Sequence, residues 1–329
     1  MSWINHDLYI DKINTYIDPM KPVERAIVTH GHADHARAGH QKVLATRQTI
    51  DIMQRRYGVH CAASFQALEY GETVNIDGFK ISLHPAGHIL GSAQVLIEYQ
   101  GQKVVATGDY KTRAEGTAQA FESVPCDIFI TEATFALPVF QHPDPKQEIQ
   151  KLLHSVNTKP ERSHVIGAYA LGKTQRVIKL LRDAGYDEPI YIHGANSKLC
   201  EYYQQQGIEL GELRKALDKD KQDFKGHIVM APPSALKDRW SRRLPDPVIC
   251  YASGWMSVKQ RAKQSQVELP LVISDHADWN ELIEAIPASG AETIWVTHGR
   301  EQALVHWCKQ QGLNAEPLSI QGREEEQVD

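Results

Sequence analysis

Three histidines and an aspartate lie within six consecutive positions directly after a short apolar run, and this stretch limits the possible folds most strongly. The run Ala26–Val28 has the composition of a strand, and His30, His32, Asp34 and His35 follow it. A strand that ends in such a loop brings several metal-ligating atoms close together. Scattered surface histidines would not be expected to cluster in this way. The motif therefore predicts a metal site at the end of a strand.

Three further candidate ligands also stand where apolar runs end: His88, Asp109 and His298. Two adjacent divalent cations need about four protein ligands each, preferably with one carboxylate between them. Asp109 is the natural bridge, because a carboxylate can give one oxygen to each ion. Nitrogen and oxygen donors without thiolate suit zinc or manganese. Together these residues predict a site for two divalent metal ions, Zn or Mn.

Composition restricts the class of protein. Of the 329 residues, 42% are hydrophobic and 23% are charged, as in a globular protein with a substantial core. No apolar run approaches the roughly 20 residues that cross a bilayer, so no membrane partner is expected. The N-terminal segment resembles neither a secretion signal nor a transit peptide, which predicts a cytoplasmic location. The five cysteines are odd in number and widely separated, which argues against a disulfide framework and against a thiolate zinc site.

The chain changes character twice, which predicts an inserted domain. Residues 1–145 read as short strands joined by tight turns, and residues 146–262 as alternating strands and helices of a parallel sheet. Residues 263–329 return to strands that end in histidine, followed by an acidic tail. The middle segment holds 20 basic and 13 acidic residues, against 16 and 28 elsewhere. This balance favours an anionic partner for the insertion, unless the charges only fluctuate along a solvated surface.

Several motifs resemble those of the metallo-β-lactamase superfamily. They are His30-x-His32-x-Asp34-His35, Pro85-Ala86-Gly87-His88 and Thr107-Gly108-Asp109-Tyr110. Other segments are similar to the β-CASP nuclease branch of that superfamily: Thr131–Phe135, Ala168–Gln175, Tyr251–Met256, Ser274–Trp279 and Val296–Gly299. The resemblance spans nearly the whole chain. It implies an α/β fold, a metallo-β-lactamase αββα sandwich with an inserted α/β β-CASP cap domain, and an active site at one sheet edge.

The resemblance also implies which side chains hold each ion. One metal would be held by His30, His32, His88 and Asp109. The other would be held by Asp34, His35, Asp109 and His298. Asp18 resembles the carboxylate that supports the ligands in this superfamily.

Glu132 and His276 match a pair in which the carboxylate orients a histidine that can protonate the leaving oxygen. We therefore expect His276 to act as a general acid, with Glu132 and Asp34 also in the catalytic set. The ions would activate the attacking water and take up charge on the phosphate oxygens. His276 could instead be a further metal ligand or a hydrogen-bonded core residue, and the residues alone leave this open.

Two basic groups in the insertion are candidates for substrate binding. Lys173 and Arg176 begin a helix after Gly172, where backbone amides and positive charge favour phosphate. The second group could follow a nucleic-acid strand, with an aromatic ring that stacks on a base. It consists of Arg239, Trp240, Arg242 and Arg243. A solvated helix face explains either group about as well.

The resemblance is strongest to the compact bacterial DNA-ligase-associated exonucleases, which are Artemis-like. It implies a metal-dependent DNA exonuclease that acts in DNA repair or end processing, with an ATP-dependent DNA ligase or a helicase encoded nearby as partner. A β-CASP ribonuclease that processes RNA is the alternative, because His298 stands where DNA-repair members often have an apolar residue. A small-molecule ester or thioester hydrolase on the same metal core is a second alternative. The cap insertion and the pair Glu132 and His276 argue against it, and a non-enzymatic scaffold would be expected to have lost ligands.

Overall fold

The computed structural model describes residues 3–216, 224–238, 240–244 and 246–318. The chain divides into two compact units, which we call unit 1 (residues 1–141 and 276–327) and unit 2 (residues 142–275). Unit 2 extends beyond the expected range 146–262, because strand β16 (Leu269–Leu271) pairs with β15 (Val248–Ala252) in its sheet. The expected acidic tail lies outside the described residues.

The first sheet of unit 1 has five strands in the order β1-β2-β3-β4-β5. Strands β2 to β5 are parallel and β1 is antiparallel to β2. Their bounds are β1 Tyr9–Ile10, β2 Thr15–Ile17, β3 Arg25–Ile27, β4 His40–Ala45 and β5 Ala62–Ala67, with a short 3-10 turn η1 at Asp11–Ile13. Helix α1 (Arg47–Tyr57) begins where Thr46 caps it by accepting a hydrogen bond from the Thr49 amide.

The second sheet of unit 1 has seven strands in the order β18-β17-β10-β9-β8-β7-β6. Their bounds are β6 Thr73–Ile76, β7 Phe79–Pro85, β8 Ala93–Tyr99, β9 Gln102–Ala106, β10 Ile128–Ala133, β17 Thr293–Gly299 and β18 Asn314–Pro317. The predicted hairpin at Asp77-Gly78 joins β6 and β7. Strands β9, β10, β17 and β18 are parallel, so their carboxyl ends lie at one edge of the sheet.

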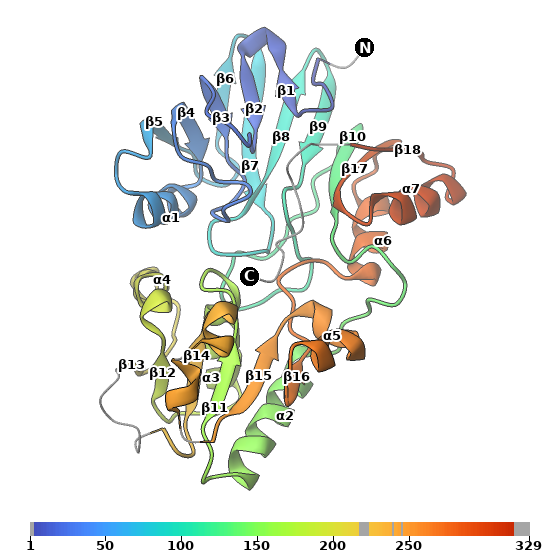
Figure 1. Cartoon of the computed structure of the whole chain (residues 1–329). Coiled ribbons are helices and arrows are strands. Elements are labelled where there is room, and N and C mark those ends of the chain that lie inside the picture. The colour runs from blue at the N-terminus through green and yellow to red at the C-terminus, as the bar shows by residue number, and fades with distance from the viewer. Residues whose placement is uncertain (1–2, 217–223, 239, 245, 319–329) are drawn as a thin grey trace. The chain divides into compact units, whose positions relative to one another are not determined.

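Side chains that follow one another along a strand point to opposite faces of its sheet and so pack into different layers of unit 1. Ile27 and Leu44 join the core between the two sheets, whereas Val43 packs toward Ile50 and Met53 of α1. On the outer face of the second sheet, helices α6 (Trp279–Ala288) and α7 (Glu301–Gln310) cover a third apolar cluster. Figure 1 shows α1 beside the first sheet and α7 beside β17 and β18. The predicted αββα sandwich is confirmed.

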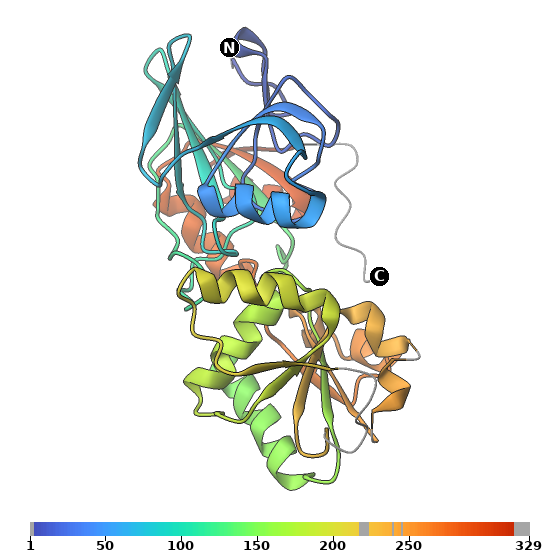
Figure 2. The same cartoon turned by 90° about the vertical axis from the view of Figure 1, so that its left-hand side faces the viewer.

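Unit 2 is a parallel six-stranded sheet in the order β13-β12-β14-β11-β15-β16, as strand-helix alternation predicts. The strands not yet given are β11 His164–Gly167, β12 Ile190–Ile192, β13 Leu213–Lys215 and β14 Ile228–Ala231. The helices are α2 Pro145–Thr158, α3 Lys173–Asp183, α4 Gly194–Gln205 and α5 Lys259–Gln264, with 3-10 turns η2 Pro233–Lys237, η3 Ser241–Arg243 and η4 Gly254–Ser257. Figure 2 shows the strands of this sheet with α3 and α4. No helix in the described ranges is long and apolar enough to cross a membrane.

Candidate metal centre

Asp18 fixes the loop that follows β3. Its Oδ1 accepts a hydrogen bond from the Thr29 amide at 2.8 Å, and its Oδ2 accepts one from Thr29 Oγ1 at 2.7 Å. The same Oδ2 lies 2.7 Å from Nδ1 of His35. Asp18 itself has a left-handed backbone, with φ +47°. One buried carboxylate therefore orients both the start of the loop and one of its imidazoles, which is the position expected for a ligand-supporting residue.

The first group of candidate ligands is His30, His32, His88 and Asp109, whose ligating atoms all lie within 4.8 Å of one another. Nδ1 of His32 is 3.1 Å from Nε2 of His30 and 3.0 Å from Nε2 of His88. Two nitrogens bound tetrahedrally to one zinc ion would be about 3.3 Å apart. Three imidazole nitrogens that converge at this spacing fit a metal site.

The second group is Asp34, His35 and His298. Asp109 lies between the two groups: its Oδ2 is 3.5 Å from Nε2 of His30, and its Oδ1 is 3.5 Å from Nε2 of His35. Its Oδ1 is also 3.3 Å from Nδ1 of His298. Each oxygen of this carboxylate therefore faces a different group. This is the arrangement predicted for a bridging ligand.

Buried atoms without hydrogen-bond partners support the assignment. Within the described ranges, Oδ1 of Asp34, Nε2 of His35 and Nε2 of His298 are buried and accept or donate no hydrogen bond. Orphaned buried polar atoms are costly, and a cation would satisfy them. The donor set contains no thiolate, so its chemistry fits zinc or manganese.

The charges in the cluster also fit a cation. Burial lowers the pKa of His30 well below its usual value and keeps this imidazole neutral, which is the form that binds metals. Burial opposes the ionisation of Asp109, but the neighbouring imidazoles, His35 first, hold its pKa well below the usual range. Burial also opposes protonation of His35, yet the carboxylates around it raise its pKa to about 9. The carboxylates of Asp109, Asp34 and Asp18 therefore favour positive charge at the second group.

Backbone features at the strand ends allow these side chains to approach. Gly108 has φ +57°, and a Cβ there would lie 2.6 Å from Oγ1 of Thr29. Gly299 has φ +109°, and a Cβ there would lie 2.4 Å from the carbonyl oxygen of Ala133. His298 adopts φ +61°, which is uncommon for a residue with a side chain and is typical of functional sites. The glycines next to Asp109 and His298 were a readable signal of close packing.

The predicted pair Glu132 and His276 lies beside the metal cluster. Nδ1 of His276 is 3.0 Å from Oε2 and 3.2 Å from Oε1 of Glu132, and Tyr110 donates its amide to Oε1 at 2.9 Å. Nδ1 of His276 is also 3.9 Å from Oδ2 of Asp109. Glu132 is buried, whereas the His276 side chain is 18% exposed. The imidazole therefore has a fixed partner on one side and remains accessible.

Sequence reasoning missed a buried polar cluster that supports the loop after Asp109. Oε1 of Glu281 accepts hydrogen bonds from the Thr112 amide and hydroxyl at 3.0 Å and from the Arg113 amide at 2.8 Å. Its Oε2 accepts from Lys111 Nζ at 3.2 Å and from the Asp278 amide at 3.1 Å. The readable signal was Asp278-x-x-Glu281, a capping box at the start of α6.

Two of the candidate substrate-binding residues, Lys173 and Arg176, are buried. Lys173 is buried in an ion pair with Asp275, and Arg176 is buried and donates to the Ser274 carbonyl at 2.9 Å. Both contacts lie within unit 2, where these side chains hold the end of its chain segment. Trp240 packs edge-on against His193, with ring centroids 4.8 Å apart, and Arg243 is exposed. Arg239 and the side chain of Arg242 lie outside the described residues.

Comparison with known proteins shows which residues of this chain are similar to a known superfamily and to individual relatives. Residues 19–163 match the metallo-β-lactamase superfamily. A protein of Opitutus terrae named "Probable DNA ligase" is 28% identical over 323 residues, which cover 96% of this chain and 31% of that protein. The endoribonuclease YSH1 of Eremothecium gossypii is 23% identical, over 74% of this chain and 39% of its own length. An RNase J-like protein of Methanocaldococcus jannaschii is 27% identical, over 60% of this chain and 57% of its own length.

The chain thus spans less than two thirds of each of these relatives. Among solved structures, a protein of unknown function from Enterococcus faecalis V583 has the same fold, with a TM-score of 0.54 at 14% identity. That alignment covers 82% of this chain and 74% of the other.

Proposed function

We propose that this chain, in which residues 19–163 match the metallo-β-lactamase superfamily, is a metal-dependent nuclease that hydrolyses phosphodiester bonds in DNA. The observation that carries the proposal is the position of His276. Its Nδ1 is hydrogen-bonded to Glu132 and lies 3.9 Å from Oδ2 of Asp109. Asp109 in turn faces both groups of candidate ligands. A phosphodiester has an alkoxide leaving group, and a proton donor in this position would assist its departure.

The two groups of candidate ligands would hold one divalent ion each, with Asp109 shared between them. Zinc or manganese bound there would supply an activated water and neutralise charge on the phosphate. Asp34 is less buried than the other candidate ligands, with 14% of its side chain exposed. Asp34 is therefore the candidate ligand that we assign to accept a proton from the attacking water.

His276 acts on the leaving group. Glu132 accepts the Nδ1 proton and so fixes the tautomer and the orientation of the ring. Nε2 is then the atom that donates a proton to the leaving oxygen. Without that proton the departing sugar alkoxide would be a poor leaving group, so the residue would contribute about 100-fold or more to the rate.

Similarity across 96% of the chain to a protein named as a DNA ligase supports DNA as substrate and a role in end processing beside a ligase. The names of two other relatives, an endoribonuclease and an RNase J-like protein, favour RNA as the second candidate. His298, near the end of β17, supports the same alternative. We rank DNA first because the match to the ligase-named protein covers more of this chain.

Digestion of end-labelled substrates tests the proposal. Linear single-stranded DNA, linear duplex DNA, RNA and circular single-stranded DNA are incubated with the purified chain and zinc or manganese. We expect shortening of linear DNA, intact circles and no activity after chelation. Cleavage of RNA with DNA left intact would establish the ribonuclease instead. Hydrolysis of thioesters without cleavage of either nucleic acid would favour the small-molecule hydrolase.

A further inference from the structure

Four side chains form a polar row across the inner face of the first sheet of unit 1. The strand register places Thr15 beside Arg25, Arg25 beside Lys42, and Lys42 beside Ser64. Two residues further along each strand, the next row is Ile17, Ile27, Leu44 and Gln66. Side chains two residues apart share a face, so the polar row lies on the face that elsewhere forms the core between the sheets.

The two cations in this row repel one another. Arg25 and Lys42 are direct neighbours on adjacent parallel strands, which lie about 4.8 Å apart. Like charges at such positions are destabilising. In the described part of the chain Arg25 has no ion-pair partner, and Lys42 reaches only the exposed Glu24, at 3.7 Å. The fold therefore places a half-buried Arg25 without an ion-pair partner in the described residues beside an exposed Lys42.

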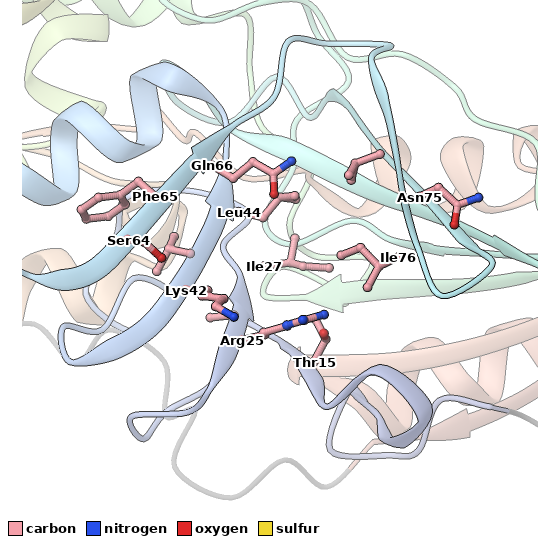
Figure 3. Close-up of a pocket in the computed structure, with 13 residues that line it drawn as sticks. Thr15, Arg25, Ile27, Lys42, Leu44, Ser64, Phe65, Gln66, Asn75 and Ile76 are labelled. Atoms are coloured by element: carbon pink, nitrogen blue, oxygen red, sulfur yellow. The ribbon is translucent and has the colours of Figure 1, made fainter.

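A pocket of about 310 Å³ lies over this row. Ile27 and Leu44 of the first sheet and Val74 and Ile76 of the facing strand β6 provide its apolar walls. In Figure 3, Thr15, Arg25 and Lys42 lie on one side of the pocket, and Ile27 and Ile76 lie next to them. The volume is at the lower end of the range for small-molecule sites, roughly 300–1,000 Å³.

This pocket is separate from the metal centre. Arg25 is the first residue of β3, whereas His30 follows the other end of that strand. Five residues of extended chain span roughly 16 Å. None of the candidate metal ligands lines the pocket. The two sites are therefore at opposite ends of the same strands.

We infer that the pocket binds a small organic anion, with its carboxylate or phosphate against Arg25 and Lys42 and its compact apolar body between the two sheets. The anion relieves the repulsion between the two cations, and its apolar part covers Val74 and Ile76, which are otherwise half-exposed. This site does not depend on the nuclease proposal, because it uses none of the same residues.

Fluorescence titration with anilinonaphthalene sulfonate, an anion with an aromatic body, tests the site. We expect one probe molecule per chain to be displaced by competing organic anions. Octanoate and adenosine monophosphate are the two competitors, and the better one identifies the head group as carboxylate or phosphate. Arg25→Gln and Lys42→Gln should each weaken binding about 10-fold. Ser64→Phe should also weaken it, since the larger side chain fills the pocket without a change in charge.

Lys80→Gln is the matched control, because Lys80 is an exposed cation of β7 that does not line the pocket. It should leave affinity within twofold of the wild type. Thermal unfolding without probe separates lost binding from lost structure: the Arg25 and Lys42 variants should melt no lower than the wild type, because one of two repelling charges is gone. Equal affinity in all variants would overturn the site. Displacement by inorganic phosphate as efficient as by both organic anions would overturn the role of the apolar walls.

Discussion

Nδ1 of His276 lies 3.0 Å from Oε2 of Glu132, although 144 positions separate the two residues in the chain. The carboxylate is itself held by the Tyr110 amide. Because Asp109 is next to Tyr110 in the sequence, the same short segment positions a candidate metal bridge and the partner of the proton donor. The geometry of the dyad and that of the metal centre are therefore coupled through one backbone segment.

Replacement of the proton donor should affect substrates according to their leaving group. We expect His276→Ala to lower turnover of DNA about 100-fold or more, but to have little effect on a p-nitrophenyl phosphodiester, whose leaving group needs no proton. Initial rates on both substrates at a fixed metal concentration measure this. His84→Ala is the control, because His84 forms a similar pair with Glu122, at 3.2 Å, in another part of unit 1. Equal losses on both substrates would contradict the general-acid role.

Removal of the support beneath the ligands should weaken metal binding. Asp18→Asn keeps the shape of the side chain but removes the charge that faces Nδ1 of His35. We expect a 10- to 100-fold lower metal affinity. Competition with a coloured chelator measures it, and Asp7→Asn at an exposed position is the control. An affinity that stays at the wild-type value would show that Thr29 and the loop backbone orient His35 without this carboxylate.

Acid should destabilise the fold through Glu281. Burial would raise its pKa, but Lys111 and the amides of Arg113 and Asp278 lower it from 4.5 to about 2. Because the pKa of Glu281 is lower in the folded than in the unfolded protein, its ionised form stabilises the fold at pH values above about 4.5. This contribution is lost as the pH falls from about 4.5 toward 2. The contribution is about 3 kcal/mol at neutral pH.

Urea unfolding between pH 5 and 2.5 checks this window. Glu281→Gln should be less stable at pH 5 and show a shallower pH dependence. The exposed Glu284 provides a comparison on the same helix, and Glu284→Gln should unfold like the wild type. A Glu281→Gln variant with the same acid profile as the wild type would rule out this carboxylate as the source.

Close packing at Gly108 should make it intolerant of a side chain. Gly108→Ala strains a backbone with φ +57° and pushes a methyl group against Thr29. Gly101 has φ +83°, and no atom lies within 4 Å of the position that a Cβ would take. Gly101→Ala should therefore lower the stability through backbone strain alone, by about 1 kcal/mol. We expect Gly108→Ala to cost about 1–3 kcal/mol more. Denaturant titration of both variants measures the difference, and equal stability would mean that the Thr29 segment can move away freely.

Much of unit 1 could be predicted from the sequence, because its ligands follow apolar strands. His30, Asp109 and His298 could be recognised from residue type and from their place at the end of a run, and parallel strands bring such ends together. The αββα layers were implied by the family resemblance. The distances from each oxygen of Asp109 to the two groups needed coordinates.

Other features depend on contacts that no short stretch of sequence encodes. The burial of Lys173 requires Asp275, which lies 102 positions away. Most of the donors around Glu281 come from a loop about 170 positions earlier in the chain. The polar row on the first sheet depends on the register of four strands at once. Propensity and periodicity are local, so they identify strands but not which side chains meet across them.

The insertion of unit 2 between β10 and β17 has a consequence for biosynthesis. His276 and His298 are translated only after all of residues 142–275, yet β17 must pair with β10 to bring them to Glu132 and Asp109. A nascent chain that has not passed this point, or one truncated within unit 2, lacks His276 and one candidate ligand. The order of the chain thus delays assembly of the complete set of candidate site residues until residues 276–298 have been synthesised.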